Sequence, residues 1–498
     1  MTILLHWVII KSAIKVKVIS SKLYLNDLLL LKLPICHKAE IFLEGLMDYI
    51  IALKDFLWNY VIIFLLVFVG IFFTIKLKFP QIRRIGQSIK STVGGVFKKK
   101  EGPKEEGEVS SFQALSTAVA AQLGTGSVGG VASAIMVGGP GAVFWMWISG
   151  MLGMSTIFAE AILAQVYRQE KDGDIYGGPA YYIRDGLKNK KLAKFLSVTF
   201  AIFIVLALGF AGNMVQSNSI AISMKEGFGI KPAYIGIVLA VLVAMIVMGG
   251  IQRISKIAEL IVPIMASIFF LAGLVILVMF RQNIIPVIKT IFVSAFTGSA
   301  VFGAAAGISV QTAIKMGLSR GLFANEAGMG STPHAHAVAN VEKPADQGLS
   351  AMFGVLVGII ICTVTAFSIL LTDAHLESYK LGLDSVAVTQ LAFETAFGRA
   401  GSIFLAISLF FFAFSTIVGW YYFGESNIVY LFGNKAVLVY RLLVIIAVMV
   451  GTVVSVDTVW MLSDTFNALM VIPNVIGLLL LSKIVVKEAD RLNDPLKR

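Results

Sequence analysis

Long apolar stretches recur along most of this chain and are separated by short polar or charged segments. Each apolar stretch is about 20 residues long, which is the length at which an α-helix crosses the hydrocarbon core of a bilayer. The pattern predicts an all-α polytopic membrane protein with 11 transmembrane helices. The predicted helices lie near residues 57–77, 112–137, 140–167, 195–223, 233–250, 257–280, 292–315, 348–372, 400–432, 436–455 and 457–486.

Two of these stretches are interrupted by glycine near their middle. The first, at 112–137, opens at Leu123-Gly124-Thr125-Gly126-Ser127, and the second, at about 292–318, contains Phe302-Gly303 among small residues. Glycine releases the backbone from helical geometry, and bare N–H and C=O groups inside a bilayer are tolerated only where they line a cavity within the protein. A matched pair of broken helices predicts a secondary transporter with its substrate site near the membrane centre.

The helix that precedes the first broken one stands outside a regular division of the chain. The remaining ten helices divide into five plus five, each half beginning with a broken helix, as in an inverted repeat. The first 46 residues fit no part of this scheme, and a start of translation at Met47 is an alternative. The expected segments are an N-terminal extension (1–46), an extra helix with a basic linker (47–111), two five-helix repeats (112–280 and 281–486) and a tail (487–498).

Composition and charge agree with a membrane protein. The chain is 57% hydrophobic and 14% charged, whereas soluble domains carry about 25% charged residues. The net charge of +12 does not require a nucleic-acid partner, because the basic residues gather in the loops of one side, as they do on the cytoplasmic side of membrane proteins. We therefore expect a multi-pass protein of the cell membrane, embedded in the lipid bilayer, with its N-terminus outside and its C-terminus in the cytoplasm.

Several polar residues near the breaks are candidates for binding. The half-helix ends at a break offer N–H groups to a carboxylate and C=O groups to a cation. Thr125 adds a hydroxyl and Gln122 an amide one turn earlier. Asn213 and Gln216 lie within one turn of another helix, where they either reach the substrate or join helices. Adjacent hydroxyls at Ser415-Thr416 either bond to their own helix or form an oxygen cage for a cation.

Three ionisable residues are candidates for gating or coupling. Glu160 is a carboxylate in an apolar helix, where it either titrates in proton coupling or pairs with loop charge such as Arg168. Arg320 and Glu326 flank a glycine-containing loop. An ion pair between Arg320 and Glu326 would either latch the inward-facing gate or serve only the structure.

The chain resembles the alanine or glycine:cation symporter family, the sodium:alanine symporters, over about residues 50–485. The resemblance is carried by long stretches that occur in the same order: Gly124-Thr125-Gly126, Gly138-Gly139-Pro140-Gly141, Gly177-Gly178-Pro179, Gly212-Asn213-Met214-Val215-Gln216, Asn325-Glu326-Ala327-Gly328-Met329-Gly330, Phe414-Ser415-Thr416 and Ile472-Pro473-Asn474. It implies the inverted-repeat fold of the bacterial leucine transporter with one extra N-terminal helix. It also implies transport of small neutral amino acids with Na⁺ or, in some members, H⁺.

The resemblance also implies roles for individual residues. Gly124, Thr125 and Gly126 would hold the substrate carboxylate. Phe302 and Gly303 would line the opposite break, and Trp420 would limit the size of the substrate side chain. The Na⁺ site would be formed by Ala120, Leu123, Phe412, Ser415 and Thr416.

One position departs from the family pattern. The family commonly has Asn after Gly-Thr-Gly, where this chain has Ser127. In the wider fold an Asn at that place can help to hold a second Na⁺, and serine is a shorter ligand. We therefore expect one Na⁺ per transport cycle.

These observations predict a secondary active symporter that couples inward Na⁺ movement to uptake of alanine or glycine by alternating access. A proton-coupled carrier of the same fold and an amino-acid sensor that does not transport are the alternatives. The sequence contains no nucleophile–base set or metal cluster that would indicate an enzyme. It leaves the oligomeric state open, along with the choice among alanine, glycine and serine.

Overall fold

The computed structural model describes residue 45 and residues 47–97, 108–171, 173–297, 309–383 and 385–493. Helices make up most of these residues, and the first half of the chain forms the elements η1 (Leu57–Ile62), α3 (Ile63–Lys76), α4 (Pro80–Arg83), α5 (Ile85–Phe97), β1 (Val109–Ser110), α6 (Ser111–Gln122), η2 (Gly126–Gly130), α7 (Val131–Gly138), α8 (Gly141–Val166), β2 (Gln169–Lys171), β3 (Asp174–Tyr176), α9 (Pro179–Gly186), α10 (Lys190–Ile204), η3 (Val205–Gly212), α11 (Asn213–Phe228), α12 (Pro232–Val247) and α13 (Gly250–Met279).

The second half of the chain is also mostly helical. Its elements are η4 (Arg281–Asn283), α14 (Ile284–Thr297), α15 (Val310–Asn325), α16 (Pro333–Ala337), β4 (Ala339–Asn340), α17 (Pro344–Leu371), α18 (Ala374–Leu381), α19 (Ser385–Phe397), α20 (Arg399–Phe432), η5 (Asn434–Ala436), α21 (Val437–Gly451), α22 (Val456–Leu480), α23 (Ser482–Asp490) and η6 (Arg491–Asn493). The expected all-α class is therefore confirmed.

Membrane crossing is supported for fewer helices than the sequence predicts. Eight helices within the described part of the chain are long and apolar enough to cross a bilayer, and the bent pair α6–α7 would make nine. The expected count of eleven is not confirmed. Helix α12 has only 16 residues, and the predicted helix at 292–315 is divided between α14 and α15, on either side of residues outside the described ranges.

Apolar side chains cover much of the outside of the bundle. Tyr60, Phe64, Leu260 and Leu271 are each more than half exposed. Many polar residues are buried instead, among them Asn213, which has no exposed surface. This inversion suits a protein whose outer surface meets lipid, because a buried polar group can then be hydrogen-bonded inside the protein.

Several pairs of helices that pack closely join the two halves of the chain. Helix α8 packs along α17, α11 along α20, α7 against α15, and α6 against α16. Glycine permits the α8–α17 approach, since a Cβ at Gly150 would lie 2.6 Å from Ile359.

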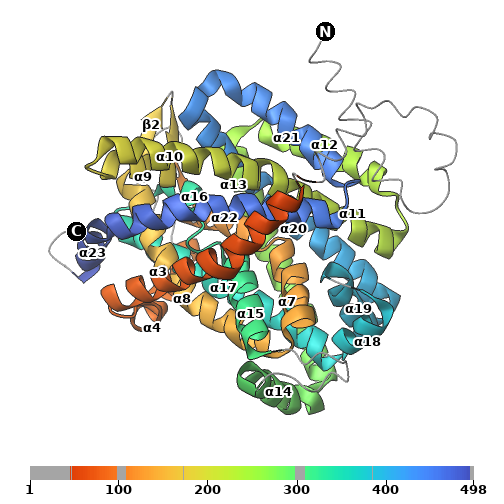
Figure 1. The fold of residues 1–498 in the computed structure, drawn as a ribbon. Coiled ribbons are helices and arrows are strands. Elements are labelled where there is room, and N and C mark those ends of the chain that lie inside the picture. The colour runs from red at the N-terminus through yellow and green to blue at the C-terminus, as the bar shows by residue number, and fades with distance from the viewer. Residues whose placement is uncertain are drawn as a thin grey trace, which may run out of the picture.

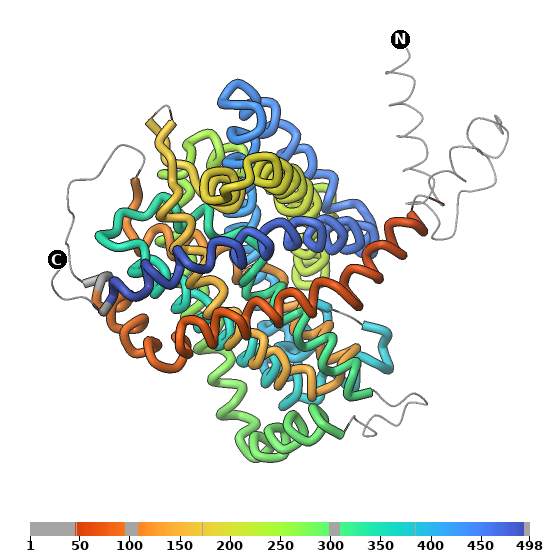
Figure 2. The backbone as a smooth tube through the Cα atoms, turned by 60° about the vertical axis from the view of Figure 1, so that its left-hand side comes forward, coloured from red at the N-terminus to blue at the C-terminus, as the bar shows by residue number. Residues whose placement is uncertain are grey.

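The first helix lies beside the last one. Figures 1 and 2 show η1 and α3 (red to orange) running alongside α22 (dark blue). At one end the indole N–H of Trp58 donates to the backbone carbonyl of Asp464 at 2.9 Å. At the other end Lys76 Nζ donates to Ser482 Oγ at 3.0 Å. The extra helix is therefore attached to α22 through Asp464 and to α23 through Ser482.

A short parallel strand pair joins segments more than 200 residues apart. Val109 and Ser110 of β1 pair with Ala339 and Asn340 of β4. Strand β1 leads directly into α6, and β4 follows α16. The pair therefore ties α6 to α16. Helix α6 begins at a capping box, in which Ser110 Oγ accepts from the backbone N–H of Gln113 and the Gln113 side chain accepts from the N–H of Ser110.

Candidate functional site

The first predicted break is present. Helix α6 ends at Gln122, with Leu123 as its C-cap, a π-helical turn covers Gly126–Gly130, and α7 continues at an angle of 50° to α6. Gly124 needs its lack of a side chain, because a Cβ there would lie 2.6 Å from Thr416 Oγ1 and 2.9 Å from Gln216 Oε1. The break therefore lies directly between α20 and α11.

Helix α11 supplies a partner for the opened backbone. The backbone N–H of Thr125 donates to Gln216 Oε1 at 3.0 Å, an interaction that replaces a helical hydrogen bond. Asn213 lies one turn earlier on α11, and its Nδ2 donates to the carbonyl of Gly209 at 3.1 Å. The sequence left open whether these amides face the site or join helices. Gln216 does contact the break.

The structure places a different glycine-rich segment opposite the first break. Phe302 and Gly303, the predicted second break, lie outside the described residues. Helix α15 instead ends at Asn325, and α16 begins at Pro333. Between them the backbone takes positive φ at Glu326 (+53°), Gly328 (+83°) and Gly330 (+79°). Gly126 packs against this end of α15, since a Cβ there would lie 3.2 Å from Phe323. We refer to residues 326–332 as the 326–332 break.

Glu160 holds the 326–332 break by its backbone. Glu160 Oε2 accepts from the N–H of Gly328 at 3.1 Å, and Oε1 accepts from the N–H of Gly330 at 3.0 Å and from Asn474 Nδ2 at 2.7 Å. Asn474 Nδ2 also donates to the carbonyl of Gly328 at 2.9 Å, and its Oδ1 accepts from Tyr182 Oη. A carboxylate can accept several N–H groups at once, so it suits a backbone segment without helical partners.

The ion-pair partners suggested for Glu160 and Arg320 are wrong. Arg168 pairs with Glu108 at 2.8 Å and does not reach Glu160, which faces the interior of the bundle. Arg320 lies 3.9 Å from Asp464 and over the ring of Trp460.

The Glu326 side chain instead accepts hydrogen bonds from two uncharged groups. Its Oε1 accepts from the indole N–H of Trp420 at 2.6 Å, and its Oε2 accepts from Ser331 Oγ at 2.5 Å. Both residues that flank the loop therefore pair across helices and not with each other.

Three buried polar atoms, at the first break and on α11, have no hydrogen-bond partner among the residues that the structure describes. They are Thr125 Oγ1, Asn213 Oδ1 and Gln216 Nε2. All three side chains are fully buried, and leaving such an atom without a partner costs about 1–3 kcal/mol. One donor and two groups that can accept, gathered beside the opened backbone, are what a small zwitterion would satisfy.

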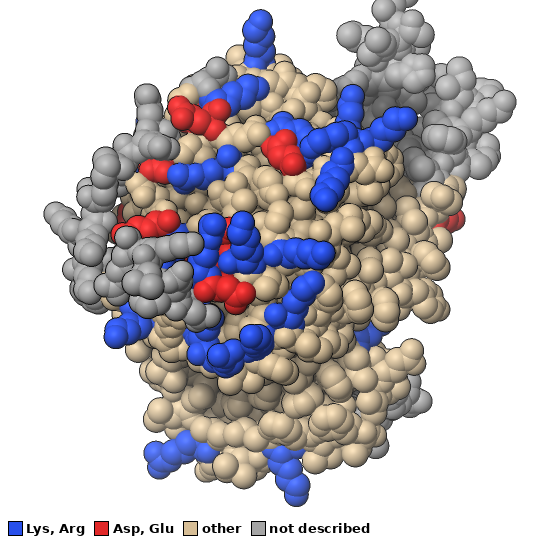
Figure 3. Space-filling model, turned by 90° about the vertical axis from the view of Figure 1, so that its left-hand side faces the viewer, with Lys and Arg blue, Asp and Glu red and all other residues tan. Residues whose placement is uncertain are grey.

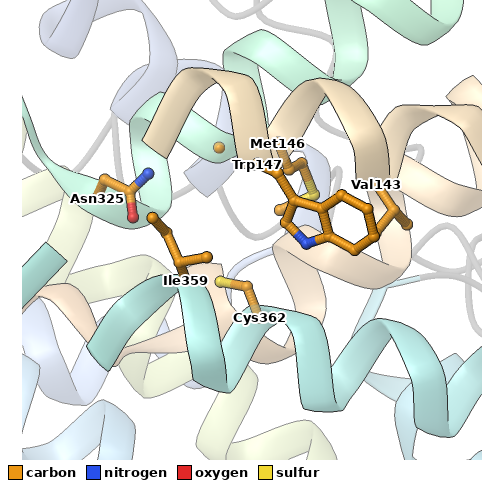
Figure 4. Close-up of a pocket in the computed structure, with 7 residues that line it drawn as sticks. Val143, Met146, Trp147, Asn325, Ile359 and Cys362 are labelled. Atoms are coloured by element: carbon orange, nitrogen blue, oxygen red, sulfur yellow. The ribbon is translucent and has the colours of Figure 1, made fainter. Parts of the chain in front are cut away.

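Two further unpartnered oxygens face α17. Gln122 Nε2 donates to the backbone carbonyl of Asn325 at 2.9 Å, which links the two breaks. Gln122 Oε1 and Asn325 Oδ1 have no partner within the described ranges. Figure 4 shows the Asn325 amide at a cavity that it lines with Trp147, Ile359 and Cys362. The cavity measures about 10 Å³, which is room for about one water molecule.

Two aromatic side chains, Trp420 and Phe323, pack near the two breaks. Trp420 packs against Gly212, where a Cβ would lie 2.7 Å from the indole. Phe323 meets Trp420 edge-to-face, with ring centroids 6.5 Å apart. The hydrogen bond to Glu326 holds the indole of Trp420 in place.

The predicted cation ligands form a compact set of oxygens. Thr416 Oγ1 lies 2.6 Å from the carbonyl of Ala120 and 3.0 Å from the carbonyl of Phe412, and Ser415 Oγ donates to the carbonyl of Phe412 at 2.9 Å. Leu123 is the C-cap residue of α6. Ser415 and Thr416 both bond to their own helix, and Thr416 also crosses to α6, while the oxygen cage for a cation stays a prediction.

In this arrangement, apolar helices surround an opened backbone with buried polar groups beside it. Such an arrangement is typical of a membrane transporter. The model of the sodium:alanine symporter family matches residues 43–498. The chain belongs to this family and is a cation-coupled amino-acid symporter, not an enzyme.

Individual relatives agree over nearly their full length. The chain is 43% identical to the sodium/alanine symporter AgcS of Methanococcus maripaludis, covering 89% of this chain and 96% of the relative. It is 39% identical to the probable sodium/glutamine symporter GlnT of Bacillus subtilis (89% and 90% covered). It is also 39% identical to the putative sodium/proton-dependent alanine carrier protein YrbD of Bacillus subtilis (89% and 92% covered).

The contact of Gly124 with α20 and α11 leads to a first prediction. Gly124→Ala should lower amino-acid uptake roughly tenfold or more, because the new methyl group displaces Thr416 or Gln216 from the site. Gly130→Ala is the matched control, since a Cβ at Gly130 meets nothing within 4 Å. Initial uptake rates, normalised to the amount of protein in the membrane, distinguish the two. Equal uptake by both variants would contradict the assigned geometry.

Glu160 gives a second prediction. Glu160→Ala leaves the N–H groups of Gly328 and Gly330 without their acceptor, so it should lower the melting temperature of the detergent-purified protein by several degrees. Glu160→Gln retains one acceptor oxygen and should fall between wild type and alanine. The exposed Glu394 serves as the control position. A melting temperature for Glu160→Ala equal to that of Glu394→Ala would show that the carboxylate does not hold the break.

Proposed function

We propose that this symporter couples inward Na⁺ movement to uptake of alanine or glycine. The observation that carries the proposal is the group of unpartnered polar atoms on Thr125, Asn213 and Gln216 beside the opened backbone. A free amino acid offers a carboxylate and an ammonium group within a few ångströms of each other. No basic side chain is needed to bind the carboxylate if N–H groups meet it.

The polarity of the site suggests how the amino acid lies. Gln216 Nε2 is the unpartnered donor, and with the backbone N–H groups of the Gly124–Gly126 segment it would meet the substrate carboxylate. Asn213 Oδ1 and Thr125 Oγ1 are the unpartnered acceptors and would meet the ammonium group. This orientation agrees with the role that the family resemblance implies for Gly124, Thr125 and Gly126.

The wall formed by Trp420 and Phe323 favours a small side chain. The indole is held on one edge by Glu326 and on its face by Gly212, so it has little freedom to retract. Discrimination by one methylene group in such a pocket is worth about 1–3 kcal/mol. Alanine and glycine are therefore the proposed substrates.

Na⁺ would bind where α6 is interrupted. The carbonyls of Ala120 and Phe412 and the hydroxyls of Ser415 and Thr416 are oxygen ligands of the kind that a hard cation prefers. Thr416 Oγ1 also lies next to the Cα of Gly124. An ion that fixes Thr416 would thus fix the segment that binds the carboxylate, which is a physical route for cooperative binding of ion and substrate.

One Na⁺ per cycle remains our proposal. Ser127 Oγ donates to the carbonyl of Gln122 at 3.2 Å, so its hydroxyl is engaged within the break itself.

The pair of Arg320 and Asp464, beside Trp460, is the proposed gate on the side of the site away from the 326–332 break. In the proposed orientation this is the outer side.

A proton-coupled carrier is the second candidate, and a specific observation favours it. Glu160 and Glu326 are fully buried carboxylates at the 326–332 break, and each is hydrogen-bonded only to neutral groups among the residues that the structure describes. Either carboxyl group could take up a proton without breaking an ion pair. The alternative of a sensor without transport has no such support.

The arrangement in the membrane is also proposed. The basic loops place the N-terminus outside and the C-terminus in the cytoplasm by the positive-inside rule. The close pairing of α8 with α17 and of α11 with α20 supports two repeats, at about 112–280 and 281–486. Rocking of the core helices against the surrounding scaffold helices would then expose the site to the cytoplasm.

The function is tested by uptake of labelled L-alanine into proteoliposomes under three gradients of equal size: inward Na⁺, inward K⁺ and an inward proton gradient. We expect accumulation only with Na⁺. Accumulation driven by the proton gradient alone would favour the second candidate and direct attention to Glu160 and Glu326. Absence of alanine and glycine uptake under every gradient would overturn the proposed substrates.

Thr416 allows the cation site to be tested separately. Thr416→Val removes the hydroxyl ligand and keeps a side chain of similar size. It should raise the Na⁺ concentration for half-maximal uptake about tenfold. Thr395→Val is the matched control, because Thr395 Oγ1 is exposed and bonds only to the carbonyl of Leu391 in its own helix. An unchanged Na⁺ dependence in Thr416→Val would remove Thr416 from the site.

A further inference from the structure

A groove with a basic rim lies where α10 begins. It encloses about 310 Å³ between α9, α10 and α20 and is lined by Arg184, Lys190, Ala193, Lys194, Val198, Tyr430 and Leu431. It belongs to the side of the molecule that Figure 3 shows, where Lys and Arg side chains gather. The transport site does not include any of these residues, so the groove needs a separate explanation.

The charge of the groove is only partly balanced. Lys190 and Lys194 are one helical turn apart, both exposed, and neither pairs with a carboxylate in the described part of the chain. Lys190 Nζ reaches the carbonyl of Arg184 at 3.5 Å. Arg184 is the exception, since it pairs with Asp185 at 2.8 Å. Three cationic groups against one carboxylate favour an anionic ligand.

The position of Arg184 is fixed by aromatic rings. Its guanidinium lies over Tyr181 and Tyr430, 5.4 and 5.3 Å from the ring centroids. Tyr430 is itself held by a hydrogen bond from its hydroxyl to Ser197 Oγ at 2.8 Å. Less side-chain freedom is then lost when an anion binds, and a planar guanidinium suits a phosphate group.

Apolar side chains next to the groove place it at a membrane boundary. Lys190 is the first residue of a continuous helical run, Lys190–Phe228, that is long and apolar enough to cross a bilayer. Within its first turns Phe195 is 67% exposed, and Phe432 at the end of α20 is 69% exposed. Exposed aromatic residues beside lysines are typical of the level at which lipid headgroups meet acyl chains.

We propose that this groove binds the headgroup of an anionic phospholipid from the leaflet that the basic side of the molecule meets. The headgroup phosphate would lie among Lys190, Lys194 and Arg184. The first carbons of an acyl chain would follow Val198 and Leu431. Basic pockets between membrane helices bind acidic lipid headgroups in this manner.

Native mass spectrometry of the purified full-length protein tests this, with phosphatidylglycerol as the anionic probe and phosphatidylcholine as the neutral one. The double variant Lys190→Ala/Lys194→Ala should lower phosphatidylglycerol affinity about tenfold or more, since each lysine near a membrane surface strengthens binding about fivefold. Lys483→Ala/Lys487→Ala is the matched control: an exposed lysine pair with the same spacing on α23, outside the groove. It should leave the affinity unchanged.

Three results would overturn the proposal. Equal losses in the two double variants would mean that total surface charge, and not the groove, binds the lipid. Equal retention of phosphatidylcholine by wild-type protein would show that the net negative charge is not recognised. Displacement of phosphatidylglycerol by millimolar inorganic phosphate would identify a soluble anion as the ligand.

Discussion

Backbone groups released by a break in a buried helix must find partners inside the protein, and this requirement organises the structure around its centre. Gln216 accepts from the opened backbone at Thr125, and Glu160 accepts from two glycine N–H groups of the 326–332 break. Gln216 lies on α11 and Glu160 on α8, and Asn474 of α22 donates to the carbonyl of Gly328. These three helices are therefore held in place by hydrogen bonds to backbone groups that the breaks leave without helical partners. The support is incomplete at Thr125, Asn213 and Gln216, which is where we propose that the substrate binds.

Much of the fold could be predicted from local pattern alone. Most of the apolar stretches correspond to helices, and the first break lies where the glycines indicated it. Local pattern could also find Ser415-Thr416, because two hydroxyls beside each other in an apolar helix are conspicuous. Helix count was less certain. A 16-residue helix such as α12 and the separate helices α14 and α15 do not show by length alone whether they cross a bilayer.

The 326–332 break could not be found in this way, for a physical reason, and the predicted break at Phe302-Gly303 lies outside the described residues. Judged by sequence alone, Glu326 looks like part of a solvated loop. Its burial depends on Trp420, 94 positions later, which donates to the carboxylate. Arg168 likewise pairs with Glu108 and not with Glu160. Pairings of this kind are set by tertiary contacts, and only the repeated glycines at 328 and 330, both with positive φ, marked the segment locally.

The parallel strand pair between β1 and β4 has a mechanical consequence. It joins the segment just before α6 to the segment just after α16, and Arg168 reinforces the joint by donating to the carbonyl of Ala339 at 3.0 Å. The strand pair thereby couples α6 to α16. Neither can swing away alone without separating the strands, so a path to the site from this side requires both to move together or the joint itself to open.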